Sequence, residues 1–440
     1  MLRNRRGVPI STTNKTSLDR FEQAAELLVS YFVDPLAVID QALAEDPDFV
    51  MGHCLKAGLA VMSAEKAARP MLSDSVAQLE RLSGHASALE RGHLRAARAW
   101  LAGDFAGSVR LYGEVLLDEP RDLLALQIAH IGDFLLGESQ MLRDRVAQVL
   151  PHWSVDTPGY GYVLGMHAFG LEETGQYARA EEVGQRALEQ NRRDPWAVHA
   201  VAHVMEMTGR TDEGIRFLGG RSADWAPDNG FAFHNWWHLA LFHLELGDQE
   251  RALAVYDEHI RPRPSKIAYE NVDASALLWR LQLRGADVRE RWAVLAADWA
   301  EVAEEGHYAF NDVHAVAAFV NAERHGEAAR TLAAMERALQ QPGTNAMMTR
   351  DVGLPLAKAL VAFSRAQYDE CLQLLLPIRT IVHRFGGSHA QRDLVHLTLL
   401  EAALRGRRFA LARALAAERL DRKPESPFNR LLASRSALAA

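Results

Sequence analysis

Several features are scarce in this 440-residue sequence, and each scarcity narrows the class of protein. Only two cysteines occur, Cys54 and Cys371, and no CxxC pair is present. We therefore expect neither a disulfide framework nor a zinc knuckle. We expect instead a reducing, cytoplasmic setting. The basic start, residues 1–6, is not followed by an apolar run, so no secretory signal is expected. No stretch approaches the roughly 18 apolar residues that a membrane span needs.

Concentrated charge and catalytic motifs are also missing. The net charge is −8 and no basic stripe occurs, which argues against a nucleic-acid partner. GxxxxGK[ST], GxSxG and HExxH are absent, and the glycine-containing run at 159–165 follows no strand pattern. Alternating strand patterns are absent too. No cofactor and no β-sheet are therefore expected.

What the sequence does contain is a period. A chain of this length exceeds the roughly 250–300 residues of a single core, so either several domains or a repeat array is required. Small, turn and aromatic residues match positions 8, 15, 17, 20, 24 and 32 of a 34-residue tetratricopeptide unit at Ala96, Gly103, Phe105, Ser108, Tyr112 and Pro120. Further glycines follow apolar helix patterns 34 or 38 residues apart, at Gly137, Gly175, Gly209, Gly247 and Gly285.

This period predicts an all-α, tetratricopeptide-type α-solenoid. We expect about ten antiparallel helix pairs in a right-handed superhelix, curled around a central pocket. Residues 18–424 form the single solenoid, residues 1–17 a disordered N-terminal arm, and residues 425–440 a C-terminal cap. Within the unit of Gly247, Trp236 and Tyr256 fall at packing positions, so both are expected to be buried.

Polar and aromatic residues recur at the positions that face the concave surface of such an array. Two helices each carry a histidine pair at i, i+4, a spacing that places both rings on one helix face. The predicted ligand-binding residues are His199, His203, Glu206, His234, Trp237, His238, Asn311 and His314. His314 joins them only if the superhelix curls, and whether His389, Arg392 and Asp393 also join is left open.

A metal site is the alternative use of the same histidines. Two i, i+4 histidine pairs on adjacent helices could supply four imidazoles. However, HExxH is absent and no Asp or Glu occurs at a known ligand spacing. The sequence therefore predicts no metal, and purified protein is expected to carry no stoichiometric zinc.

Five segments resemble the tetratricopeptide repeat protein 38 family: HAVAHVMEMTGR (199–210), FHNWWHLALFHLELGD (233–248), NVDASALLWRLQLRGADV (271–288), FNDVHA (310–315) and FGGSHAQRD (385–393). The likeness extends in the same order from about residue 20 to Pro427. It implies a wholly helical repeat protein of soluble, cytosolic type, and it supplies no catalytic residues.

Two functions remain open at this stage. The first is a binding module that holds a small molecule or short peptide in a His- and Trp-rich concave pocket. The second is an enzyme that uses pocket histidines as general acid or base on a small molecule, since imidazole titrates near neutral pH. The oligomeric state is not indicated by the sequence.

Overall fold

The computed structural model describes residues 1–438, which divide into two compact units. Unit 1 comprises Met1–Val201, Ala223–Phe231 and Pro342–Thr344, and unit 2 comprises Ala202–Ser222, Ala232–Gln341 and Asn345–Ala440. The single solenoid expected over residues 18–424 stays a prediction. One boundary lies inside helix α11, between Val201 and Ala202.

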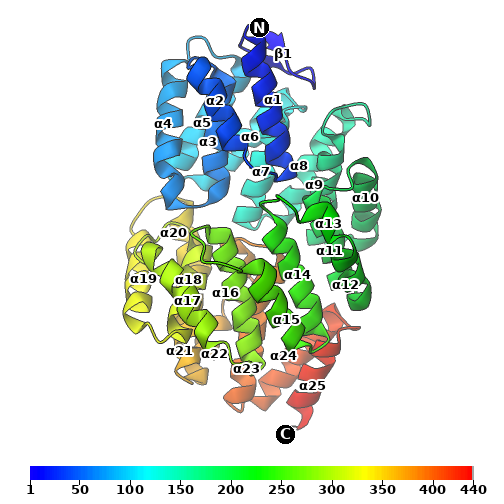
Figure 1. Cartoon of the computed structure of the whole chain (residues 1–440). Coiled ribbons are helices and arrows are strands. Elements are labelled where there is room, and N and C mark those ends of the chain that lie inside the picture. Colours follow the sequence, from blue (N-terminus) through cyan, green and yellow to red (C-terminus); the bar gives the residue numbers. More distant parts are fainter. Residues whose placement is uncertain (439–440) are drawn as a thin grey trace. The chain divides into compact units, whose positions relative to one another are not determined.

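Unit 1 is built from helices that pack against their neighbours in sequence, α1 on α2, α5 on α6 and α9 on α10 (Figure 1). Its elements are β1 (Leu2–Arg3), β2 (Pro9–Ile10), α1 (Lys15–Ser30), α2 (Pro35–Glu45), α3 (Val50–Ser63), η1 (Lys66–Ala68), α4 (Arg69–Arg81), α5 (Ala88–Leu101), α6 (Phe105–Asp118), α7 (Leu123–Leu136), α8 (Ser139–Val149), η2 (Leu150–His152), α9 (Tyr160–Glu173), α10 (Tyr177–Gln190), the first half of α11 (Pro195–Met207) and most of α13 (Ser222–Trp225).

Unit 2 continues the same pattern, with α14 on α15, α18 on α19 and α23 on α24. Its elements are the second half of α11, α12 (Thr211–Gly220), α14 (Ala232–Glu245), α15 (Gln249–Val255), η3 (Tyr256–Ile260), α16 (Ala268–Leu283), α17 (Arg289–Trp299), η4 (Ala300–Val302), α18 (Ala309–Asn321), α19 (His325–Ala338), α20 (Thr344–Met348), η5 (Thr349–Gly353), α21 (Leu354–Ser364), α22 (Tyr368–Leu375), η6 (Val382–Phe385), α23 (His389–Arg405), α24 (Phe409–Arg422) and α25 (Pro427–Leu438).

The pair α5–α6 shows why the sequence period produces helix pairs. A capping box between Ser87 and Glu90 starts α5, and Gly103, at φ +86°, supplies the left-handed turn that follows the helix. The small residues at positions 8 and 20, Ala96 and Ser108, are fully buried, so the two helices approach closely. The all-α prediction is confirmed, with helix pairs that use the predicted repeat positions.

The N-terminal segment differs from the expected disordered arm. Leu2 pairs with Ile10 in a two-stranded antiparallel hairpin, and Gly7 turns the chain at φ +81°. The hairpin is fixed to α1 by an ion pair between Arg6 and Glu22 (3.0 Å) whose side chains are 4% and 3% exposed. Strands of two residues are too short for an alternating pattern to be visible in the sequence, and the burial of Ile10 is a tertiary effect.

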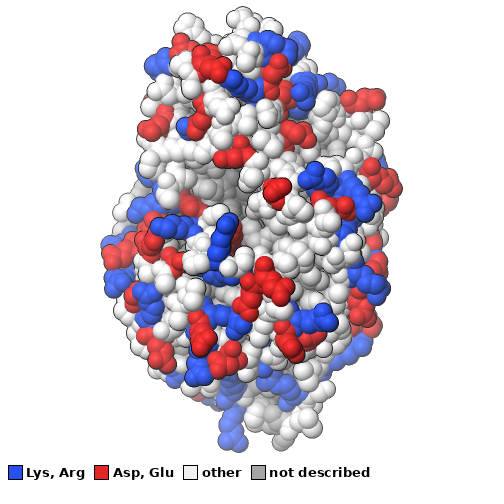
Figure 2. Space-filling model, in the orientation of Figure 1, with Lys and Arg blue, Asp and Glu red and all other residues white. Residues whose placement is uncertain are grey.

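The expected C-terminal cap corresponds to α25, which packs on α24 in unit 2. Residues 439–440 of this segment lie outside the described residues. On the face drawn in Figure 2, acidic and basic side chains are interspersed, as the sequence indicates. Within residues 1–438, no helix combines the length and the apolar character needed to cross a bilayer.

One of the two burial predictions for the unit of Gly247 differs from the structure. Tyr256 is buried as expected, at 2% exposure, but Trp236 is only half-buried and stacks on the partly exposed ring of His259, with ring centroids 3.9 Å apart. Its neighbour Trp237 is fully buried instead. The prediction that Trp236 is buried was therefore wrong, because one step along a helix turns a side chain by about 100°.

Candidate functional site: a buried histidine centre

The second half of α11, which belongs to unit 2, carries two residues of the site, His203 and Glu206. The helix begins after Asp194, whose Oδ1 accepts hydrogen bonds from the backbone N–H groups of Trp196 (3.0 Å) and Ala197 (3.1 Å). Alanine and valine residues occur on all faces of the helix that follows, which is typical of a helix that is buried on every side. His203 is fully buried, and Glu206 lies one turn further on with its side chain 16% exposed.

Helix α14 supplies the next residues. His234, Trp237 and His238 stand at i, i+3 and i+4, on one face of the helix, and are 6%, 0% and 0% exposed. The indole of Trp237 stacks on His234, with ring centroids 5.4 Å apart and an interplanar angle of 13°. The ring of His238 lies 4.3 Å from that of His203 and 5.0 Å from that of His234. We call His203, His234 and His238 the histidine centre.

Two of these imidazoles are each bonded to a carboxylate from a different helix. His234 Nδ1 lies 2.5 Å from Asp273 Oδ2, on α16, and His238 Nδ1 lies 3.2 Å from Glu206 Oε2, on α11. An ionised carboxylate accepts and cannot donate, so each Nδ1 carries the hydrogen of its bond. The carboxylates thereby fix both the tautomer and the ring orientation.

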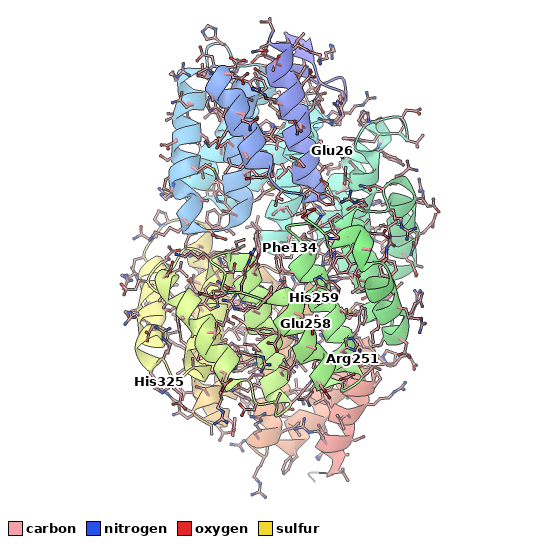
Figure 3. The ribbon with its side chains drawn as sticks, viewed as in Figure 1. Glu26, Phe134, Arg251, Glu258, His259 and His325 are labelled. Carbon is pink, nitrogen blue, oxygen red and sulfur yellow. The ribbon has the colours of Figure 1, made fainter. Side chains whose placement is uncertain are left out.

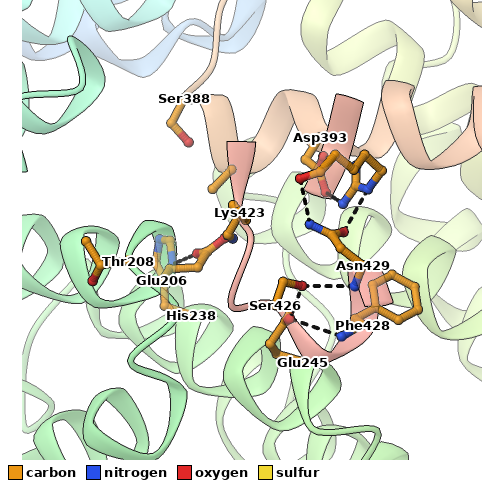
Figure 4. A network of polar contacts seen from close by, with 12 residues as sticks. Glu206, Thr208, His238, Glu245, Ser388, Asp393, Lys423, Ser426, Phe428 and Asn429 are labelled. Atoms are coloured by element: carbon orange, nitrogen blue, oxygen red, sulfur yellow. Dashed lines mark hydrogen bonds and ion pairs between the residues drawn. The ribbon is translucent and has the colours of Figure 1, made fainter. Parts of the chain in front are cut away.

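The charges around the centre are unequal. Burial, together with nearby His203, lowers the pKa of His238 well below its ordinary value, so this ring is neutral at pH 7. Burial alone would raise the pKa of Glu206. Lys423, 3.4 Å away, and the hydrogen bond from His238 outweigh burial, and the pKa of Glu206 falls well below its ordinary value (Figure 4). A neutral His238 therefore faces an ionised Glu206.

A layer of cations lies beside the centre, on α16, α24 and the segment after α24. The guanidinium of Arg280 stands 5.3 Å over the Trp237 ring and donates to the carbonyl oxygens of Ala276 (2.9 Å) and Ala390 (2.6 Å). Arg419 makes a two-pronged pair with Asp393, at 2.5 and 3.0 Å. Although burial raises the pKa of Asp393, Arg419 holds it below its ordinary value.

This layer encloses a small polar cavity of about 40 Å³. Glu206 and Lys423 from the site line it together with Arg280, Arg284, Asp393 and Arg419. A cavity of that size holds one water molecule, since a water occupies about 30 Å³ in the liquid. It is much smaller than the roughly 300–1,000 Å³ of a site for a drug-sized ligand.

The structure brings five of the predicted site residues together within unit 2: His203, Glu206, His234, Trp237 and His238. His314, on α18, is buried, donates from Nδ1 to the carbonyl oxygen of Phe310 (2.7 Å) and packs on the Phe310 ring. Burial lowers the pKa of His314 to about 4. Asn311, one turn earlier on α18, is half-buried.

His199 lies on the other side of the unit boundary. In unit 1 its ring contacts Phe169, Trp196 and Phe231, at centroid distances of 5.0, 5.1 and 5.3 Å. The i, i+4 spacing with His203 predicts a shared helix face correctly, but the two histidines belong to different compact units.

Several residues around the centre were not among the predicted ligands. Asp273 faces His234 from 39 residues further along the chain, a tertiary pairing with no sequence signal beyond the NVDAS segment. Gln391 donates to Asp273 Oδ1 at 3.4 Å. Of the residues left open, His389 lies against His203, at a centroid distance of 5.2 Å, whereas Asp393 is held by Arg419 and Arg392 donates to the carbonyl of Gly387.

The chain was compared with known protein families and with solved structures. No known protein family matches the sequence. Among solved structures, the chain is similar to the TPR domain of P58(IPK), with 16% sequence identity over 89% of this chain and 98% of that chain, at a TM-score of 0.22. At that score the two structures do not superpose as whole bodies, so this similarity supports neither a shared site nor a shared function. The functional conclusion rests on the histidine centre itself.

Proposed function

We propose that this chain is a tetratricopeptide-type repeat protein that binds a small polar molecule at the histidine centre of unit 2. The observation that carries the proposal is the pairing of two buried imidazoles with two carboxylates, His234 with Asp273 and His238 with Glu206. Burying such groups costs free energy that packing alone does not return. An arrangement of that cost favours a functional centre over a structural one.

The chemistry of the centre indicates the class of ligand. Oriented imidazoles offer lone pairs to a hydrogen-bond donor, the indole of Trp237 offers an apolar face, and Lys423 supplies a positive charge at the edge. Such a surface suits a small, polar or partly aromatic molecule better than an extended acidic peptide. The 40 Å³ cavity beside Glu206 implies that entry of anything larger than water requires side chains to move.

The two cysteines bear on the cellular compartment that we propose. Cys54 and Cys371 are both buried and free, which supports a reducing, cytoplasmic environment. The resemblance of five segments to the tetratricopeptide repeat protein 38 family supports placing the chain beside that family. Arrays of this type commonly bind peptides or proteins, and we propose such a partner only as the alternative to a small molecule.

The test is to identify what the purified protein retains. The wild-type chain, His238→Ala and His325→Ala are prepared identically, denatured, and the released small molecules are compared by mass spectrometry. His325, an exposed residue at the start of α19, is the matched control (Figure 3). We expect one compound in near-stoichiometric amount from wild type and His325→Ala, and its loss from His238→Ala. Equal retention by all three variants would exclude the centre as the binding site.

A second candidate function is general acid–base catalysis on the bound molecule. It is favoured by the 2.5 Å contact between His234 Nδ1 and Asp273, because a carboxylate behind an imidazole stabilises the protonated ring and fixes its tautomer. Asp273→Asn keeps the shape but reverses the hydrogen-bond polarity. For an enzyme, this variant retains the compound and loses its turnover, whereas for a binding protein no conversion of the compound is seen in either form.

A further inference from the structure

The histidine centre has the donor set of a transition-metal site. Each of His203, His234 and His238 offers a ring nitrogen, and these three nitrogens lie within 4.8 Å of one another. Around a tetrahedral zinc ion with Zn–N bonds of 2.0–2.1 Å, ligand nitrogens stand about 3.4 Å apart. Small rotations of the three rings therefore close the set around one ion.

The carboxylates occupy the positions that a metal site requires of its outer shell. Ligating histidines almost always donate their second ring N–H to a carboxylate or carbonyl, which orients the ring and raises its basicity. Asp273 and Glu206 do this for His234 and His238, at the Nδ1 atoms, and leave both Nε2 atoms as the ligand atoms. Gln391 in turn holds Asp273, and Lys423 holds Glu206.

The arrangement on the helices is also suited to a metal. His234 and His238 are one turn apart on α14, a spacing that points two imidazoles at one ion, and His203 completes the set from α11. Two carboxylates near the rings offset the charge of a divalent ion. Imidazole donors select zinc and its first-row neighbours over calcium and magnesium, which prefer oxygen.

We propose that His203, His234 and His238 bind one divalent transition-metal ion of the zinc class, with Asp273 and Glu206 orienting two of the three ligands. This inference rests on the proposed function, because the imidazoles that would hold the small polar molecule are the ones that would bind the ion. It reverses the sequence-based expectation of no metal, since the carboxylates come from α11 and α16 and not from a local motif.

The ion also bears on the choice between the two candidate functions. An imidazole whose Nε2 binds a metal has no lone pair left to act as a general base. If the site holds an ion, His234 is a ligand, and Asp273 is a positioning residue rather than part of a catalytic dyad. Any catalysis would then depend on the ion rather than on proton transfer by His234.

The experiment uses the full chain without an affinity tag. The protein is stripped with a chelator, mixed with a small excess of Zn²⁺, dialysed against metal-free buffer and assayed for zinc. We expect about one zinc per wild-type chain. The same treatment is applied to His238→Gln, His203→Gln and His314→Gln. His314 is the matched control, a buried histidine of the same unit whose Nδ1 is bonded to a backbone carbonyl.

The outcomes distinguish metal binding by the centre from a purely structural role of its histidines. Loss of zinc in His203→Gln and His238→Gln, with zinc retained in His314→Gln, supports the site. Asp273→Asn should bind zinc about 10–100-fold more weakly while reaching the same stoichiometry at saturation. Zinc absent from a wild-type chain with native circular dichroism overturns the proposal, as does equal loss in His314→Gln. If zinc is absent while a compound is still retained through His238, only the metal proposal fails.

Should the glutamine variants fold poorly, a second measurement decides the matter. Co²⁺ is added to stripped wild-type protein, and its visible absorption bands report coordination number and ligand type. Intense bands of a tetrahedral nitrogen-liganded ion, removed by one equivalent of Zn²⁺, support the site. A spectrum identical to that of Co²⁺ in buffer contradicts it.

Discussion

Both compact units bury histidines among aromatic rings, yet they do so in different ways. In unit 1, His130 on α7 lies edge-on to Phe169 and Trp196, at centroid distances of 6.1 and 5.6 Å, and neither ring nitrogen makes a hydrogen bond. In unit 2, His234 and His238 each have a carboxylate at Nδ1. Both environments are buried, but only the second is polar.

The difference lies in what each ring can do chemically. Burial lowers the pKa of His130 to about 3, so this ring behaves as a neutral, flat packing element. A carboxylate partner does more than neutralise the cost of burial, because it fixes which nitrogen is available and where it points. Unit 1 also contains a buried histidine–carboxylate pair, His93 with Asp122 at 2.7 Å, so what distinguishes the histidine centre is that three imidazoles and two carboxylates converge there.

The largest expected effect tests whether the two tryptophans beside these histidines have different roles. Trp196 and Trp237 are both buried, so Trp196→Ala and Trp237→Ala should each lower the free energy of unfolding by about 3–5 kcal/mol. Only Trp237→Ala should also weaken zinc or small-molecule retention, because only its ring stacks on a residue of the centre. Urea unfolding and the zinc assay measure the two effects, and equal weakening by both variants would remove the distinction.

The next effect concerns acid. The folded pKa of His130, about 3, lies below its unfolded value of about 6.5, so between these pH values only the unfolded chain binds the proton. Stability contributed by this residue is present above pH 6.5 and is lost as pH falls, by roughly 3 kcal/mol at pH 4.5. His130→Leu should therefore flatten the dependence of unfolding free energy on pH over this range by that amount.

The matched control for that measurement is His325→Leu, because His325 is exposed and its removal should leave the slope unchanged (Figure 3). Unfolding free energies at several pH values, obtained with urea, give both slopes. If His130→Leu leaves the wild-type slope intact, the ring is protonated or hydrated in the folded state, and the contrast between the two units is smaller than described.

A smaller effect tests the charge at the edge of the histidine centre. Lys423→Met leaves Glu206 without its ammonium partner and should cost about 1–2 kcal/mol at pH 7. Because the pKa of Glu206 is lowered in the folded state, the stability from this pair is present above the ordinary pKa of a glutamate and disappears as pH falls through the folded value. The difference between wild type and variant should therefore shrink in acid, and a constant difference would show that Lys423 acts by packing alone.

Much of the fold could be predicted because it depends on local chemistry. Gly209 and Gly247 were expected to end helices, and both adopt the left-handed conformation, at φ +73° and +82°. The two i, i+4 histidine pairs follow from helical geometry alone. That His203 and His238 lie side by side also follows from the repeat, because successive units place equivalent helices next to one another.

The remainder depends on partners that are distant in sequence. Nothing near His234 indicates that Asp273 will face it, since α16 approaches α14 only in the folded unit. Nor does the sequence show that α11 is shared by two compact units, with His199 among the rings of unit 1 and His203 in unit 2. Repeat periodicity predicts which helices exist, and the tertiary contacts decide which side chains meet.

The smallest expected effect concerns Trp236, the neighbour of the buried Trp237 that stacks on the histidine centre. Trp236 stacks on His259 at 3.9 Å with an interplanar angle of 10°, and both rings are partly exposed. An aromatic pair of this kind contributes about 0.5–1.5 kcal/mol beyond area burial, so Trp236→Ala should cost about 1 kcal/mol, well below the loss expected for Trp237→Ala. His259→Ala should cost a similar amount, and adding it to Trp236→Ala should cost little more, because the two variants remove one shared contact. Urea unfolding of the two single variants and the double variant measures this coupling. A loss of roughly 3 kcal/mol or more from Trp236→Ala, the range of a buried aromatic truncation, would show that this indole is part of the core, as the sequence predicts.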